Sequence, residues 1–213
     1  MASGLFDPTK LEQFKKNQLI ELVLELQKEK EDSKKQQTYM EDVMTRVVQL
    51  ERSHYLYEQY GRRESIEISG IPVNIEQDEL ENAVIEIYKE AKAEIHGRQL
   101  KRKDISACHR IGKNGVTIVR FVNRKAAYAG LYNAKNLKNS KLYNSDIFIN
   151  NSFCREFKKY GYIIRKLKKN NLIDGYKVKQ GVHQIKRLGH ADFVEISHIT
   201  DFEKYGLDGK QYM

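Results

Sequence analysis

The stretch SIEISGIP, residues 65–72, decides the fold of the middle of this 213-residue chain. Its apolar and polar residues alternate, as in a strand with one buried face, and a Gly and a Pro end it. The stretch GVTIVRFVNR, residues 115–124, alternates in the same way and ends at Asn123, a residue type that caps helices. Segments whose apolar residues recur at helical spacing lie between these two stretches and after the second one. The order strand, helix, strand, strand, helix, strand is therefore predicted for residues 62–150. This βαββαβ order is ferredoxin-like; RNA-recognition motifs have it, and so do many domains unrelated to RNA.

The spacing of apolar residues also predicts the bounds of the other elements in this middle segment. Helices are expected over residues 77–95 and 124–137, and strands over 104–111, 116–122 and 146–150. In the third strand, alternation turns Thr117, Val119 and Phe121 inward and Val116, Ile118 and Arg120 outward.

RNA-recognition motifs usually stack bases on aromatic side chains of the first and third strands. In this chain the equivalent outward positions hold Glu67, Val116 and Ile118, so ordinary base stacking across these two strands is not expected. Arg120 is predicted on the same face as Glu67, and a pairing of these two side chains is preferred over a base contact for either.

The first third of the chain is predicted to form one long helix, because no Gly or Pro occurs between Pro8 and Tyr60. One heptad register places mostly apolar residues at its two core positions, which favours a coiled coil between copies of the chain, with two or three strands left open. The polar run Lys28–Thr38 interrupts this seam, so a helix folded back as a hairpin is the alternative. The residues expected in the oligomer seam are Leu19, Leu22, Leu26, Met40, Val43, Val47 and Leu50.

The last third of the chain concentrates the positive charge. Residues 151–190 carry 11 Lys and Arg side chains against 2 acids, in a chain whose net charge is +9. A helix capped by Asn151 or Ser152 is predicted to run to about Asn170, with an apolar stripe of Phe153, Phe157, Tyr160, Ile164 and Leu167 and a basic stripe of Arg155, Lys158, Tyr162, Arg165 and Lys169, thickened by Lys159, Lys166 and Lys168.

A hairpin with a turn at Gln180–Gly181 is expected after this helix, and it carries Lys177 and Lys179. A strand over residues 193–199 follows, and then a short helix with a capping box of Thr200 and Glu203. A basic helix beside a basic hairpin is suited to a sugar-phosphate backbone, so nucleic acid is the expected ligand.

Several classes of protein are not expected. No apolar run is long enough to span a membrane and no secretory leader is recognised, so a soluble intracellular protein is expected. Cys108 and Cys154 are too few for a disulfide framework, and the six His lack metal-ligand spacing, so no metal or cofactor is expected. Cys108 and His109 point to opposite faces of a strand, and no nucleotide-binding loop or hydrolase motif occurs. An enzyme is therefore not expected.

The order of these parts resembles the RNA-binding protein encoded by the first open reading frame of LINE-type, non-LTR retrotransposons. The resemblance rests on a helix that ends near Arg62–Arg63, on the segments IEISGIP, CHRIG and TIVRFVNR at RNA-recognition spacing, and on FCREFKKYGYIIRKLKKNNLI followed by a hairpin. It covers the chain from about Met40 onward. The resemblance implies a homotrimer that binds single-stranded RNA, or single-stranded DNA, with little sequence preference and acts as a nucleic-acid chaperone. It implies a cytoplasmic ribonucleoprotein, with nuclear entry left open.

The resemblance also implies that RNA lies between the middle and C-terminal domains and contacts basic residues from both. Combined with the basic stripe, it gives the expected nucleic-acid site: Arg62, Arg63, Arg110, Lys113, Arg120, Arg155, Lys158, Lys159, Tyr162, Arg165, Lys166, Lys169, Lys177 and Lys179.

Three domains are thus predicted in an α+β chain. They are a coiled-coil helix over residues 1–61, a ferredoxin-like domain related to RNA-recognition motifs over 62–150, and a small basic α+β domain over 151–213. The alternative function is a coiled-coil scaffold whose ferredoxin-like domain binds protein, with the basic patch serving solubility.

Overall fold

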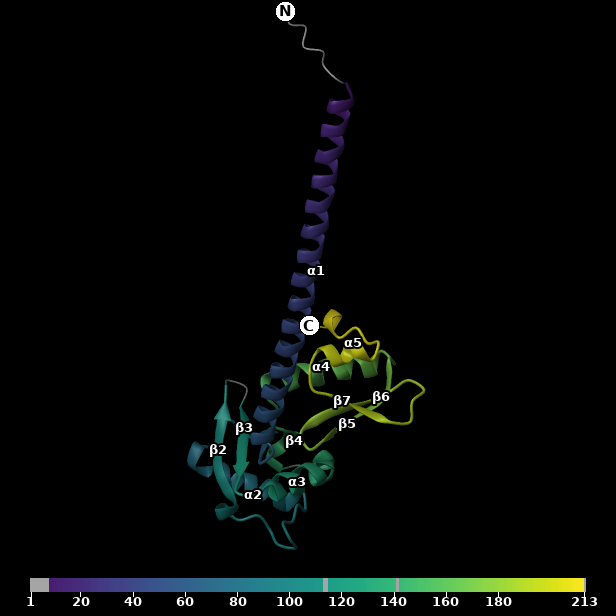
Figure 1. Cartoon of the computed structure of the whole chain (residues 1–213). Helices are drawn as coiled ribbons and strands as arrows, with labels where there is room; N and C mark the ends of the chain where they lie inside the picture. The colour runs from purple at the N-terminus through teal and green to yellow at the C-terminus, as the bar shows by residue number, and fades with distance from the viewer. Residues whose placement is uncertain (1–7, 113–114, 141, 213) are drawn as a thin grey trace, which may run out of the picture. The chain divides into compact units, whose positions relative to one another are not determined.

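A computed structural model describes residues 8–112, 115–140 and 142–212 (Figure 1). It has a long N-terminal helix followed by antiparallel sheets and shorter helices, so the predicted fold class, α+β, is confirmed. Contacts divide the chain into one unit that ends at Leu50 and a second that begins at Glu51. The predicted domain boundaries after residues 61 and 150 stay predictions.

Helix α1 runs from Pro8 to Gly61 without a break, and the polar run Lys28–Thr38 continues as helix. The hairpin alternative is therefore wrong. The predicted seam lies open to solvent: Leu19, Leu22, Leu26, Met40, Val47 and Leu50 are each exposed, and Val43 is half-buried. A single helix cannot bury such an apolar stripe by itself, which is a physical reason for copies of the chain to associate through the stripe. Self-association stays a prediction.

The first sheet contains β1 (Ser65–Ser69), β2 (Ile105–Ile111), β3 (Val116–Phe121) and β4 (Phe148–Asn151), in the order β2-β3-β1-β4 with every pair antiparallel. Helices α2 (Leu80–Glu90) and α3 (Arg124–Asn133) pack on one face. The outer side chains of β1 and β3 lie on the other face, where Glu67, Val116 and Ile118 are half-buried. The residues buried between sheet and helices include Ile66, Ile68, Val119, Phe121, Leu80, Val84, Ile87 and Tyr88.

The predicted sidedness of β3 is confirmed, because Thr117, Val119 and Phe121 are buried while Val116, Ile118 and Arg120 are not. Asn123 caps α3 as predicted, since its side chain accepts a hydrogen bond from the amide of Lys125 at 2.9 Å. Helix α3 itself ends at Asn133 and continues as the 3₁₀ helix η3 (Ala134–Asn139).

Helix α2 ends five residues before the predicted end at Ile95. The amides of Lys92 and Ala93 donate to the carbonyls of Lys89 and Tyr88, and Lys92 has a φ of 54°. This is the hydrogen-bond pattern of a Schellman C-cap, with Lys in the left-handed position that glycine usually takes. Because the expected glycine is missing, the apolar spacing through Ile95 overstates the length of the helix.

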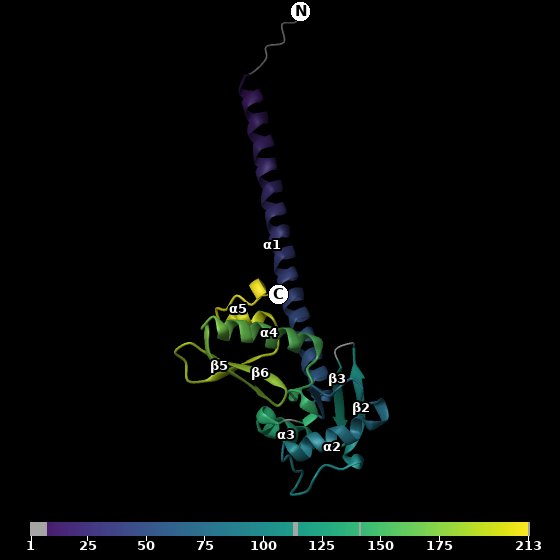
Figure 2. The same cartoon turned by 180° about the vertical axis from the view of Figure 1, so that it is seen from behind.

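The C-terminal part contains helix α4 (Arg155–Lys169), strands β5 (Ile173–Lys179), β6 (Val182–Arg187) and β7 (Phe193–Ile196), and the short helix α5 (Thr200–Lys204). The three strands form an antiparallel sheet in the order β5-β6-β7, and α4 runs across it in both views (Figures 1 and 2). The predicted apolar stripe of α4 is confirmed: Phe157, Tyr160, Ile164 and Leu167 are buried, and Phe153 just before the helix is half-buried.

The predicted cap of α4 by Asn151 or Ser152 is wrong. The residue before the helix is Cys154, whose side chain makes no capping hydrogen bond. Instead, the buried side chain of Gln59 in α1 accepts from the Cys154 amide at 3.0 Å and donates to the Ser152 carbonyl at 3.1 Å. A residue about a hundred positions earlier in the chain thus satisfies the start of α4, which no local pattern predicts.

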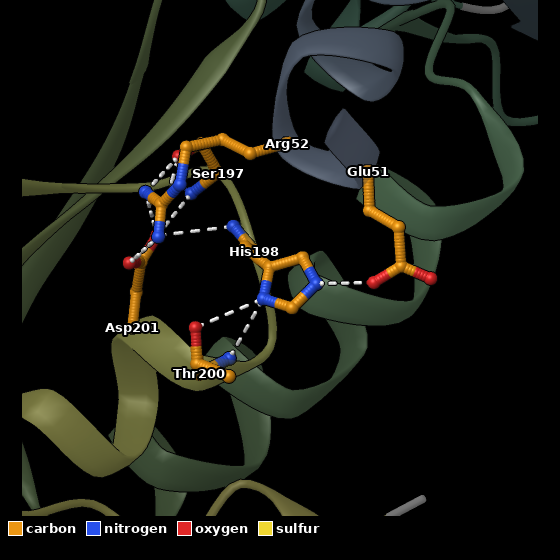
Figure 3. A network of polar contacts seen from close by, with 6 residues as sticks. All are labelled: Glu51, Arg52, Ser197, His198, Thr200 and Asp201. Atoms are coloured by element: carbon orange, nitrogen blue, oxygen red, sulfur yellow. Dashed lines mark hydrogen bonds and ion pairs between the residues drawn. The ribbon is translucent and has the colours of Figure 1, made fainter. Parts of the chain in front are cut away.

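The capping box expected at Thr200 and Glu203 is also wrong, because Thr200 is already the first residue of α5 and the N-cap makes no side-chain hydrogen bond. The carboxylate of Asp201, in the first turn of α5, instead reaches back and accepts from the amides of Ser197 (2.8 Å) and His198 (3.0 Å), which precede the helix (Figure 3). The Arg52 guanidinium of α1 donates to both Asp201 oxygens at 2.7 and 3.1 Å. Nearby, Nε2 of His198 lies 3.0 Å from the Glu51 carboxylate.

Candidate nucleic-acid interface

A cavity of about 430 Å³ lies between the first sheet and the C-terminal part. We call it the cleft. Its walls come from β1 and β4 on one side and from α4, β5 and β6 on the other, so it brings together residues from both predicted globular domains. The residues that line it are Glu67, Asn150, Asn151, Phe153, Lys158, Gly161, Arg165, Tyr176, Val178 and His183.

Two neighbouring rings, tilted by 31° to each other, form the base of the cleft. The rings of Phe153 and His183 lie 4.5 Å apart, and Nε2 of His183 donates to the Phe157 carbonyl at 2.8 Å. A Cβ added to Gly161 would lie 3.0 Å from the His183 ring, so glycine at this position lets α4 approach β6. Helix and strand therefore meet closely enough to enclose the base of the cleft.

The His183 ring is neutral at physiological pH. Burial lowers its pKa to about 4, the hydrogen bond to the Phe157 carbonyl opposes this shift, and the charge of Arg165 adds to it. The Nδ1 atom is buried and has no hydrogen-bond partner among the described residues. The base of the cleft is thus aromatic and uncharged, and the positive charge lies at its rim.

Two cations of α4 stand at that rim. The Nζ atom of Lys158 lies 2.7 Å from a carboxylate oxygen of Glu67 on β1, whose side chain is only 15% exposed. The exposed Arg165 has no ion-pair partner in the described part of the chain. Tyr176 is 45% exposed and lines the same cavity. A free guanidinium and an exposed aromatic ring in one cavity suit a phosphate and an unstacked base.

The basic stripe of α4 continues outward from the cleft as predicted, since Arg155, Lys158, Tyr162, Arg165 and Lys169 are all exposed. Lys159 is less available because its ammonium lies 2.9 Å from Glu156. Lys166 lies over the Tyr162 ring at 5.3 Å. A run of phosphates can follow this face of the helix beyond the cleft.

The hairpin lysines are not brought to the cleft. Tyr176 and Val178 of β5 line it, and side chains alternate along a strand, so Lys177 and Lys179 point to the opposite face of the sheet. There the ammonium of Lys177 lies 3.8 Å from the centre of the Phe193 ring.

Three of the remaining predicted contacts have structural partners. Arg62 pairs with Glu58 at 2.9 Å, and Arg63 donates to the Gln180 carbonyl at 3.1 Å. The Arg110 guanidinium is half-buried and donates to four backbone carbonyls, those of Ile71, Pro72, Ile75 and Gly115, which fixes the loop after β1. Lys113 lies outside the described residues.

The predicted pairing of Glu67 with Arg120 is wrong. The register places Ile118 opposite Glu67 and Ser65 opposite Arg120. Arg120 instead lies 3.8 Å from Glu64, while Glu67 is taken by Lys158. The sheet register moves Arg120 two residues away from the position that the pairing required.

No family model matches the chain, and no curated protein matches it in sequence. Any assignment of function therefore depends on the geometry described above and on the resemblance in the order of its parts.

Sequence reasoning missed the uncharged walls of the cleft. Asn150 and Asn151 end a strand, Tyr176 begins an alternating run, and His183 is a lone histidine, so none carries a chemical motif. Only the folded arrangement of α4, β5 and β6 beside β1 and β4 brings them together. The one local signal was the glycine at position 161 inside a helix, which often marks a close approach.

No helix in the described part of the chain is long and apolar enough to cross a membrane, and no cluster of three or more His, Cys, Asp or Glu side chains there is suited to a metal ion. Burial, helped by the charge of Glu81, raises the pKa of the Cys108 thiol to about 11, although the charge of Arg110 opposes the shift. Burial also raises the pKa of Cys154. Both thiols therefore stay protonated at neutral pH.

Proposed function

We propose that this chain is a single-stranded nucleic-acid-binding protein that holds RNA in the cleft and along the basic face of α4. The observation that carries the proposal is the exposed, unpaired Arg165 at the rim of a cavity whose base is aromatic and uncharged. Phosphate contacts from Lys and Arg carry no base specificity, so binding tolerates sequence.

The fold supports the same proposal. The strand order β2-β3-β1-β4, with two helices on one face, supports a ferredoxin-like arrangement of the kind that RNA-recognition motifs have. The outer positions of β1 and β3 carry Glu67, Val116 and Ile118 instead of aromatic rings. RNA therefore follows the cleft rather than the centre of the sheet, in agreement with the resemblance to the RNA-binding protein of LINE-type retrotransposons.

The exposed seam of α1 extends the proposal to self-association, with a trimer as the state that the resemblance favours. Several binding sites on one oligomer raise avidity for a long strand without new contacts. The proposed role is that of an RNA chaperone in a cytoplasmic ribonucleoprotein, with nuclear entry left to experiment.

The test is fluorescence anisotropy of a labelled single-stranded RNA of about 30 nucleotides, a length that spans several basic sites, at two or more salt concentrations. We expect tight binding that weakens steeply with salt and depends little on base sequence. The double variant Arg155→Ala, Arg165→Ala should bind more weakly and lower the slope of log affinity against log salt by about 0.7 for each phosphate that is no longer neutralised.

The matched control is the double variant Lys89→Ala, Lys103→Ala, which removes two exposed positive charges from α2 and from the 3₁₀ turn just before β2. It should bind almost as tightly as the wild type. An equal loss in both double variants would mean that only net charge matters and would reject the cleft as the site. Absence of binding at low salt would reject the whole proposal and favour a scaffold that binds protein.

A further inference from the structure

Phe148 is an exposed aromatic residue on the outer face of the first sheet, opposite α2 and α3. It is 57% exposed, and the register pairs it with Ser69 at the end of β1. Its neighbour Ile149 points into the core, so Phe148 must point to the outer face. Of the Phe and Tyr side chains in β1 to β4, all of which the structure describes, Phe121 is buried and Phe148 alone lies on this outer face.

A hollow beside β4 borders this ring. A second cavity of about 390 Å³ lies beside β4 and η3, and Phe148 lines it. Asn150 lines both this cavity and the cleft. Phe148 lies two residues before Asn150 on β4, so a single strand that leaves the cleft at Asn150 follows β4 for only two residues to reach the Phe148 ring.

The surroundings of Phe148 suit a nucleotide. The lining of the second cavity includes two basic residues, Lys135 and Lys138 of η3, and one acidic residue, Asp146. The lining therefore has an excess of positive charge. Ser69, the cross-strand neighbour, is small and leaves the face of the ring uncovered on that side. Every base has a face that stacks on such a ring, so a contact here adds affinity while leaving sequence preference low.

We propose that Phe148 is a stacking platform for an unpaired base of the same strand that lies in the cleft. The inference rests on the proposed function. It moves the stacking site from the first and third strands, where RNA-recognition motifs usually have it, to the fourth strand at the sheet edge. The bound strand then runs from α4 along β4.

The chain contains no Trp, so a single introduced Trp reports its own surroundings. We expect Phe148→Trp to bind RNA as tightly as the wild type and to lose tryptophan fluorescence on saturation, because a stacked base quenches the indole. The matched control is Leu188→Trp, at a residue 52% exposed in the turn after β6, whose fluorescence should not change on binding.

Phe148→Ala should weaken binding roughly 5- to 150-fold, the range for losing one base stacked on an aromatic ring. The slope of log affinity against log salt should stay that of the wild type, since no phosphate contact is removed. Weaker binding together with a lower slope would mean that the variant disturbs the cationic contacts, and this would overturn the inference.

The two proposals fail in different ways. Salt-sensitive RNA binding by the wild type, with no quenching in Phe148→Trp and unchanged affinity in Phe148→Ala, would overturn the stacking platform and leave the proposed function standing. A wild-type protein that does not bind RNA at low salt would overturn both.

Discussion

Arg52→Ala tests whether the last turns of α1 hold the C-terminal part in place. The wild-type guanidinium makes two charge-assisted hydrogen bonds to Asp201 and a third to the Ser197 hydroxyl at 2.7 Å. The Asp201 side chain is 3% exposed, whereas that of Arg52 is 36% exposed. The variant therefore leaves a buried carboxylate with its remaining donors from Ser197 and His198.

The size of the effect follows from these contacts. A hydrogen bond to a charged group contributes about 1.5–3 kcal/mol when buried. Because solvent reaches the arginine, water can replace part of this contribution, and we expect the free energy of unfolding to fall by about 2 kcal/mol in total. The control Arg46→Ala removes an exposed pair with Asp42 on the same helix and should cost less than about 0.5 kcal/mol.

The measurement is urea unfolding followed by circular dichroism, at equal protein concentrations, because self-association itself stabilises the folded chain. The two variants should differ by well over 1 kcal/mol if the contact holds the C-terminal part. Equal stability of Arg52→Ala and Arg46→Ala would refute the reasoning.

The same variant gives a pH dependence with a definite sign. Burial alone would raise the pKa of Asp201, but the hydrogen bonds from Arg52, Ser197 and His198 outweigh it and hold the pKa below its usual value. A carboxyl group with a lowered pKa in the folded state stabilises the protein above its unfolded pKa of about 3.9, and this stabilisation is lost as the pH falls through the folded value. The difference in stability between wild type and Arg52→Ala should therefore be full at pH 6 and shrink below about pH 4.

Two further variants test the cleft and the seam. Gly161→Ala places a Cβ 3.0 Å from the buried His183 ring, so it should lower the free energy of unfolding by about 1–3 kcal/mol and weaken RNA binding. The control Gly61→Ala has nothing within 4 Å of the added Cβ and should change neither stability nor binding. Val43→Asp introduces a charge into the predicted seam and should lower the mass measured by sedimentation equilibrium, whereas Gln49→Asp, outside the seam, should not; equal masses would reject self-association through this seam.

The parts of the fold that the sequence predicts well are those whose signal is local. Alternation in β3 and the apolar stripe of α4 depend only on the period of each element, and both are confirmed. The ends of the helices depend on partners elsewhere. Gln59 and Arg52, both in α1, complete the starts of α4 and α5, while the residues expected to cap them take no part in capping.

The candidate site divides in the same way between local and distant signals. The basic face of α4 is a periodic pattern within one helix, so its exposed residues could be named in advance. Phe148 could not, because its relation to Ser69 and to the outer face is set by the register of β4 against β1, which are joined by about eighty residues. The sequence of the first and third strands shows that their outward positions carry no aromatic ring on which a base could stack. Only the placement of the edge strand offers an alternative position for it, and the quenching of Phe148→Trp decides whether RNA takes that position.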